Sequence, residues 1–155
     1  ERSLDAGATE LDMVINIGAL VGGAYEMLEQ DIAAVASIVH QKSPHAILKV
    51  IIETALLSEE QKIVACRAVT NAGADFIKTS TGFSSGGATV EDVQLMKRSV
   101  GENVRVKASG GIRDLRLAQA LLAAGASRIG TSSGVALVRA VVERDKHATG
   151  QYEHY

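Results

Sequence analysis

An Ala-Gly-Ala tripeptide occurs three times in this chain, and each copy leads into a short run of strand-forming residues. The copies lie at residues 6–8, 72–74 and 124–126. The glycine of each copy follows a segment with helical periodicity, and a left-handed glycine at that position ends a helix without steric cost. The repeat therefore predicts a chain in which helices and strands alternate.

Two further apolar runs complete a set of expected strands. The five strands are predicted at residues 11–15, 47–52, 75–78, 104–107 and 128–130. Apolar residues of helical period lie between them and predict helices at 24–40, 58–69, 89–100, 114–122 and about 132–142. Ser58 and Gln61 form a capping box, and Thr89 and Asp114 are expected N-caps. Short strands that alternate with helices indicate a parallel sheet covered by helices.

The length of the chain limits which parallel-sheet fold this can be. Its 155 residues hold five strand–helix units, whereas a (β/α)₈ TIM barrel typically needs about 250 residues. We therefore predict an α/β fold in which residues 1–155 form a single domain, the last five units of a (β/α)₈ barrel, with 146–155 as a mobile tail. Since Glu1 is not a Met and a helix is predicted to end at Gly7, we expect a piece of a longer protein. An open doubly wound sheet is the alternative, but no G-x-G-x-x-G follows the first strand.

Composition excludes several classes of function. Sixteen Lys and Arg residues against eighteen Asp and Glu residues give a net charge of −2, and there is no Trp. This argues against a nucleic-acid partner, which usually requires a basic excess or stacking aromatic residues. No apolar run approaches the length of a membrane span. The four histidines show no metal-ligand spacing, so no metal site is predicted. The single cysteine, Cys66, is typical of a reducing compartment, so we expect a cytoplasmic protein.

Four of the five predicted strands carry an ionisable residue where a covered parallel sheet should be apolar. These residues are Asp12, Lys49, Lys78 and Lys107. The two-residue period of a strand places each of Asp12 and Lys49 opposite the apolar side chains of its own strand. That arrangement points the charged side chains into the barrel, with Lys78 and Lys107 near the C-terminal strand ends, where barrel active sites lie.

Each of these charges also has an ordinary structural interpretation. A single strand lysine is more often at a sheet edge or extended toward water, and Asp12 could pair with a structural lysine. Four such residues on consecutive strands favour a functional site. Clustered and desolvated lysines have lowered pKa values, and a neutral lysine amine is a nucleophile for carbonyl groups. The cluster therefore predicts Schiff-base chemistry.

Two glycine-rich turns follow the last two strands. One is Ser109-Gly110-Gly111, and the other runs from Gly130 to Gly134 through Ser132 and Ser133. Backbone N–H groups of such turns, next to a helix start, bind phosphate, although glycines can also serve only to make a tight turn. Arg113 could reach a phosphate or could be a solvated residue at a helix start. Beside the lysines, the turns favour a phosphorylated carbonyl substrate.

Four segments resemble the deoxyribose-phosphate aldolase family, in its shorter bacterial branch. They are residues 10–16 (ELDMVIN), 48–54 (LKVIIET), 72–82 (AGADFIKTSTG) and 106–113 (VKASGGIR). The resemblance covers essentially the whole chain. It implies a class I aldolase on a (β/α)₈ barrel that cleaves 2-deoxy-D-ribose 5-phosphate to glyceraldehyde 3-phosphate and acetaldehyde in deoxyribonucleotide catabolism. It implies no metal and no organic cofactor.

The same resemblance implies a role for each candidate residue. Lys78 would be the Schiff-base lysine, and Lys107 would be the neighbour that lowers the pKa of Lys78. Asp12 would be the acid that moves protons with Lys107 and water. Lys49 would be a further active-site lysine. The residues that would bind the phosphate are Gly110, Gly111, Ser132 and Ser133.

The chain departs from the family pattern in two places. Phe83 stands where some members have a lysine that aids phosphate binding, and Ala108 stands where some have Pro. Tyr155 ends the chain, and a C-terminal Tyr serves proton transfer in some members.

Two alternatives to this function remain. The chain could be an inactive fragment that folds partly or self-associates through open sheet edges, or it could be another Schiff-base sugar-phosphate aldolase. The expected partners are a small sugar phosphate and, in a homo-oligomer, further copies of the same chain.

Overall fold

The computed structural model describes the backbone of residues 1–149 and the side chains of residues 1–144. The expected tail at 146–155 lies outside the described side chains, and from residue 150, including Tyr155, outside the described backbone as well. The elements in chain order are α1 (Arg2–Asp5), β1 (Glu10–Val14), α2 (Ile17–Val21), α3 (Tyr25–Lys42), β2 (Ile47–Ile51), η1 (Thr54–Leu56), α4 (Glu59–Asn71), β3 (Phe76–Lys78), α5 (Val90–Ser99), β4 (Arg105–Ser109), α6 (Leu115–Ala123), β5 (Ala126–Gly130) and α7 (Gly134–Thr149).

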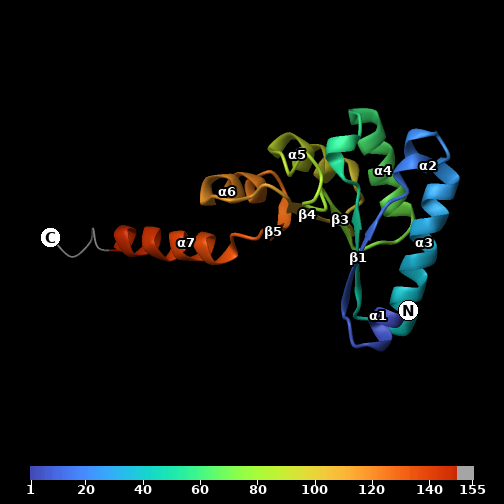
Figure 1. Ribbon diagram of the computed structural model, residues 1–155, viewed down its shortest axis with the longest axis horizontal. Helices are drawn as coiled ribbons and strands as arrows, with labels where there is room; N and C mark the ends of the chain where they lie inside the picture. The colour runs from blue at the N-terminus through green and yellow to red at the C-terminus, as the bar shows by residue number, and fades with distance from the viewer. Residues whose placement is uncertain (150–155) are drawn as a thin grey trace.

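The five strands form one sheet in which every neighbouring pair is parallel. Their order is β1-β2-β3-β4-β5, so each strand pairs with the next one along the chain. This order requires the helices that connect successive strands to cross over in the same sense and to pack on the same side of the sheet. Figure 1 shows α3, α4, α5 and α6 arranged in succession around the outside of the strands. The predicted alternation of strands and helices is therefore confirmed.

The sheet is curled rather than flat. Arg128 on β5 donates a hydrogen bond of 2.7 Å from its Nη1 atom to Oε2 of Glu10 on β1, the strand at the opposite edge. Four strand spacings of about 4.8 Å would place the two edges of a flat sheet roughly 19 Å apart, which is beyond the combined reach of these side chains. The curl gives the sheet a concave face that carries side chains from all five strands.

Local sequence signals end and begin the elements as predicted. Ser58 and Gln61 make the complete capping box of α4, while Thr89 and Asp114 accept backbone N–H groups at the starts of α5 and α6. Gly73 and Gly125, from two copies of the Ala-Gly-Ala repeat, have φ angles of +75° and +114° just beyond α4 and α6. The sequence did not predict α2 or η1, which have five and three residues and are too short to show a helical period.

The core lies between the convex face of the sheet and the helices. Fully buried side chains from the strands meet fully buried side chains from α3, α4, α5 and α6. They include Leu48, Val50, Ile77, Leu28, Ile32, Val69, Met96 and Leu121. These strand residues alternate with the charged residues of the same strands, so the apolar side chains face the helices and the charged side chains face the concave surface.

The last helix, α7, extends away from the rest of the molecule (Figure 1). Among its described side chains only Leu137 is buried, whereas Val135, Val138 and Val142 are exposed. No helix in the described part of the chain is both long and apolar enough to cross a membrane.

Candidate active site

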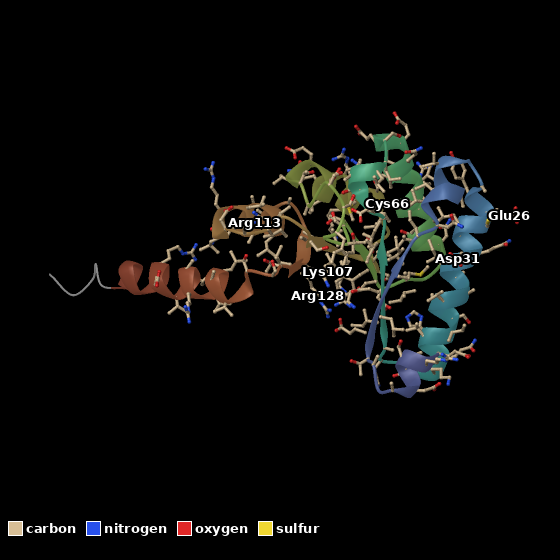
Figure 2. The ribbon with its side chains drawn as sticks, viewed as in Figure 1. Glu26, Asp31, Cys66, Lys107, Arg113 and Arg128 are labelled. Carbon is tan, nitrogen blue, oxygen red and sulfur yellow. The ribbon has the colours of Figure 1, made fainter. Side chains whose placement is uncertain are left out.

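The register of the sheet brings the four predicted catalytic residues together on the concave face. Asp12 on β1 is paired with Lys49 on β2, and Lys78 on β3 is paired with Lys107 on β4. Lys49 is also paired with Phe76, which lies two residues before Lys78 on β3. The Asp12–Lys49 pair therefore lies one side-chain row deeper in the site than the Lys78–Lys107 pair. In Figure 2, Lys107 lies beside Arg128, its register partner on β5.

Lys49 is a buried cation held by two carboxylates. Its side chain is 5% exposed, and its Nζ atom lies 3.1 Å from Oε2 of Glu10 and 3.3 Å from Oδ1 of Asp12. An unpaired charge at this depth would cost several kcal/mol, so the two carboxylates account for its tolerance there. Lys49 therefore belongs to the floor of the site, beneath Lys78 and Lys107.

Lys78 lies at the end of β3 and faces the second oxygen of the same carboxylate. Its Nζ atom is 3.4 Å from Oδ2 of Asp12, and the residue is 8% exposed. Asp12 thus bridges the two lysines, with Oδ1 toward Lys49 and Oδ2 toward Lys78. Burial raises the pKa of the Asp12 carboxyl, but the charges of Lys78, Lys49 and Lys107 outweigh that effect and hold the pKa below its usual range.

Lys107 has a different environment. Burial lowers the pKa of its ammonium group, the charge of Lys78 lowers it further, and Asp12 acts in the opposite direction. No ion pair joins Lys107 to a carboxylate among the described residues, in contrast to Lys49 and Lys78. Lys78 and Lys107 are therefore neighbouring cations of which Lys78 alone contacts a carboxylate, and this disfavours the charge on Lys107.

A cavity of about 360 Å³ opens beside these two lysines. Its walls come from the ends of β3, β4 and β5 and from the loops that follow them, and its lining residues are Lys78, Thr81, Gly82, Lys107, Ser109, Gly110, Gly111, Ile112, Arg113, Gly130, Thr131 and Ser132. The position is the C-terminal end of a parallel sheet, where ligands bind in folds of this class.

The structure places three of the four predicted phosphate residues in this cavity wall. Gly110, Gly111 and Ser132 line it, and the consecutive glycines have φ angles of +87° and +73°. Ser133 is not among the lining residues, and its backbone N–H donates to Oγ1 of Thr131 at 2.9 Å. The sequence left open whether Arg113 reaches a phosphate or is a solvated residue at a helix start. Arg113 lines the cavity and contributes the one guanidinium group among the described residues of its wall.

One buried carboxyl group near the cavity was not predicted. Glu53 is 4% exposed and, with a φ angle of +43°, is in the left-handed region. Its Oε2 atom accepts hydrogen bonds from the hydroxyl and the backbone N–H of Thr81, which lines the cavity. Glu53 therefore fixes the loop after β3 from behind. Its spacing in the sequence could have indicated this position, because Glu53 is two residues after Ile51 and four after Lys49, in the set of alternate residues that includes the charged Lys49.

The thiol of Cys66 takes no part in this site. Burial raises the pKa of the Cys66 thiol to about 12, as expected of a core cysteine. No group of three or more His, Cys, Asp or Glu residues suited to a metal ion occurs within the described part of the chain.

Comparison with known proteins identifies relatives of the whole described segment. Residues 1–144 match the family model described as DeoC/LacD family aldolase. The chain is 61% identical over 132 residues to deoxyribose-phosphate aldolase from Brevibacillus brevis, an alignment that covers 85% of this chain and 58% of that protein. The curated relatives at this level of identity are longer, and the chain spans about 60% of their length.

Solved structures give the same result for the fold. The structure titled "QR15, an Aldolase" superposes with a TM-score of 0.83 at 43% identity, covering 92% of this chain and 63% of the other. A tetrameric deoxyribose phosphate aldolase from Aeropyrum pernix superposes with a TM-score of 0.80 at 32% identity, covering 89% and 57%. These superpositions confirm the predicted fold class, a TIM barrel of which the chain covers about five strand–helix units.

Proposed function

This chain belongs to the DeoC/LacD family of aldolases, and on that premise we propose that it forms the active site of an enzyme that reversibly cleaves 2-deoxy-D-ribose 5-phosphate. The products are D-glyceraldehyde 3-phosphate and acetaldehyde. One observation carries the proposal. A nearly buried amine, Lys78, opens at the end of a parallel strand onto the same cavity that Gly110, Gly111 and Ser132 line. An amine and a phosphate-type turn in one cavity suit a phosphorylated aldehyde.

Lys78 is the proposed nucleophile. In its neutral form the amine adds to the C1 aldehyde of the open-chain sugar, and loss of water gives an iminium. The C2–C3 bond then breaks, and its electron pair forms the C1–C2 double bond of an enamine while the iminium nitrogen becomes neutral. The C3 hydroxyl loses its proton as glyceraldehyde 3-phosphate leaves. Protonation of the enamine at C2 and hydrolysis release acetaldehyde and regenerate the amine.

Asp12 and Lys107 are the proposed proton-transfer groups. The lowered pKa of Asp12 keeps it a carboxylate at neutral pH, and its Oδ2 atom lies 3.4 Å from the amine of Lys78. Lys107 faces the same cavity with a lowered pKa, so it can exchange protons more readily than an ordinary lysine. Lys49 supports this pair from below by its contact with Oδ1 of Asp12.

The phosphate group is proposed to bind between the turns after β4 and β5. Gly110, Gly111, Ser132 and Ser133 supply the two turns, and Arg113 supplies a positive charge on the wall. Phe83, at the position where some family members have a lysine, is 97% exposed and offers no charge to the site. We therefore assign the charge recognition of the phosphate to Arg113. Binding energy from this remote group orients the reacting carbons.

The choice of aldol donor tests this function against another Schiff-base sugar-phosphate aldolase. With glyceraldehyde 3-phosphate as acceptor, we expect condensation with acetaldehyde and none with dihydroxyacetone. Lys78→Leu should abolish condensation, whereas Lys42→Leu, on the exposed end of α3, should leave the rate unchanged. Condensation with dihydroxyacetone alone, or with neither donor, would contradict the proposal.

Two broader expectations accompany it. A homo-oligomer is proposed because a relative in this family is a tetramer. A monomer in sedimentation velocity would contradict that. We propose a cytoplasmic location on the strength of the single buried thiol, and cell fractionation would test it.

A further inference from the structure

A second carboxylate lies behind the proposed proton-transfer groups. Glu10 is two residues before Asp12 on β1 and therefore shares its concave face. Its Oε2 atom accepts a hydrogen bond of 2.7 Å from Nη1 of Arg128 and lies 3.1 Å from Nζ of Lys49. The Arg128 hydrogen bond, followed by that of Lys49, lowers the pKa of Glu10, so this group is charged in the folded protein at neutral pH.

These contacts form a continuous series that crosses the concave face. Arg128 contacts Glu10, Glu10 contacts Lys49, Lys49 contacts Asp12, and Asp12 contacts Lys78, with atom separations between 2.7 and 3.4 Å. The guanidinium carbon of Arg128 also lies 4.6 Å from the centroid of the Phe76 ring. Arg128 is thus fixed by an aromatic contact at one end of the series, and Asp12 is the last anion before the cavity.

The orientation of Asp12 depends on what holds Lys49. Lys49 is 5% exposed and has two carboxylate partners, so its ammonium group is balanced between Glu10 and Asp12. Without Glu10, Asp12 would be the one carboxylate of this cluster. It would then face four cations, which are Lys49, Lys78, Lys107 and Arg128. Lys49 would then interact more strongly with Asp12 and draw it away from Lys78.

We propose that Glu10 is a positioning residue for proton transfer, which holds Lys49 and thereby keeps Oδ2 of Asp12 directed at Lys78. The proposal rests on the proposed function, because it assigns Glu10 a part in the step that Asp12 performs. In that step the Asp12 carboxylate takes a C2 proton from the iminium of acetaldehyde and Lys78. The electron pair of the C–H bond forms the enamine double bond, and the nitrogen loses its positive charge.

Glu10→Gln tests the proposal with two readouts on the protein. Borohydride trapping of acetaldehyde on Lys78 reports iminium formation, and exchange of the acetaldehyde methyl protons in D₂O reports proton transfer. We expect trapping to persist and exchange to slow by about tenfold or more. The acid limb of the exchange rate should move to lower pH, because loss of a neighbouring anion lowers the pKa of Asp12 further. Glu60→Gln, on the exposed first turn of α4, is the matched control and should exchange at the parent rate.

A double variant separates positioning from folding. The double variant, Glu10→Gln together with Arg128→Gln, has no charge on either partner of the Glu10–Arg128 ion pair. It should therefore regain the thermal stability that the Glu10→Gln variant loses. Lys49 still lacks its second carboxylate, so the exchange defect should remain. Exchange at the parent rate and with the parent pH profile, in either the single or the double variant, would overturn the proposal. Failure of the parent protein to trap acetaldehyde on Lys78 would instead refute the proposed function.

Discussion

Three lysines share the concave face of this sheet, and their ion pairs distinguish them. Lys49 has two carboxylate partners, Lys78 has one at 3.4 Å, and Lys107 has none among the described residues. The number of partners falls toward the cavity. The proposed nucleophile, Lys78, therefore lies between Lys49, whose charge has two carboxylate partners, and Lys107, whose charge is the least compensated of the three.

Lys107 shows the cost of this arrangement for stability. Its pKa is lowered in the folded protein, first by burial and then by the charge of Lys78. Below the lowered pKa the folded state holds a disfavoured charge. As pH rises from that value toward the ordinary lysine pKa of 10.5, the folded state has lost the proton that the unfolded state keeps. Stability should therefore increase with pH over that alkaline window.

Lys107→Met removes the disfavoured charge and tests this account. We expect the free energy of unfolding at pH 7 to rise by about 1 kcal/mol, with loss of aldolase activity, since functional sites often reduce stability. Chemical denaturation at several pH values measures the effect, and the gain should shrink between the lowered pKa and pH 10.5. A variant less stable than the parent at neutral pH would contradict it.

At the level of elements, the two loops that meet over the cavity depend on glycine. Ala88 donates its backbone N–H to the carbonyl oxygen of Gly110 at 3.0 Å, which joins the loop after β3 to the turn after β4. A Cβ atom on Gly87 would overlap the backbone carbonyl of Gly110. The turn that is proposed to hold phosphate thus has its position set by a contact that only glycine permits.

Gly87→Ala should displace this turn and impair phosphate recognition selectively. We expect the KM for 2-deoxyribose 5-phosphate to rise about tenfold, equivalent to about 1.4 kcal/mol. Cleavage of unphosphorylated 2-deoxyribose should change much less, because Lys78 and Asp12 lie on strands that the substitution does not touch. Gly18→Ala, in α2, is the control, since its Cβ meets only ordinary contacts. Equal losses with both substrates would contradict the assignment of this turn to the phosphate.

At the scale of the whole molecule, the sequence predicted what short-range rules determine. The caps at Ser58, Thr89 and Asp114 were predicted because a cap bonds to a residue three positions away. The strand period predicted that Asp12 and Lys49 face away from the apolar side chains of their strands, and the strand ends predicted the positions of Lys78 and Lys107. Both rules act within a few residues and need no knowledge of the tertiary structure.

The parts that were not predicted depend on the curvature of the sheet or on a local exception. The Glu10–Arg128 contact joins residues 118 positions apart and exists because the edges of the sheet approach each other. Glu53 adopts a left-handed conformation that non-glycine residues rarely occupy, so its hydrogen bonds to Thr81 have no local signal. Ser133 was grouped with Ser132 by sequence, but their positions differ once α7 begins at Gly134.

In the proposed reaction a single amine, that of Lys78, attacks the substrate. Acetaldehyde with sodium borohydride would convert the iminium into a stable N-ethyl lysine, and peptide mass spectrometry would locate it. At an acetaldehyde concentration that leaves the exposed Lys42 unmodified, we expect one ethyl group on Lys78 and none in Lys78→Leu. An ethyl group on Lys107 or Lys49, with Lys78 unmodified, would contradict it.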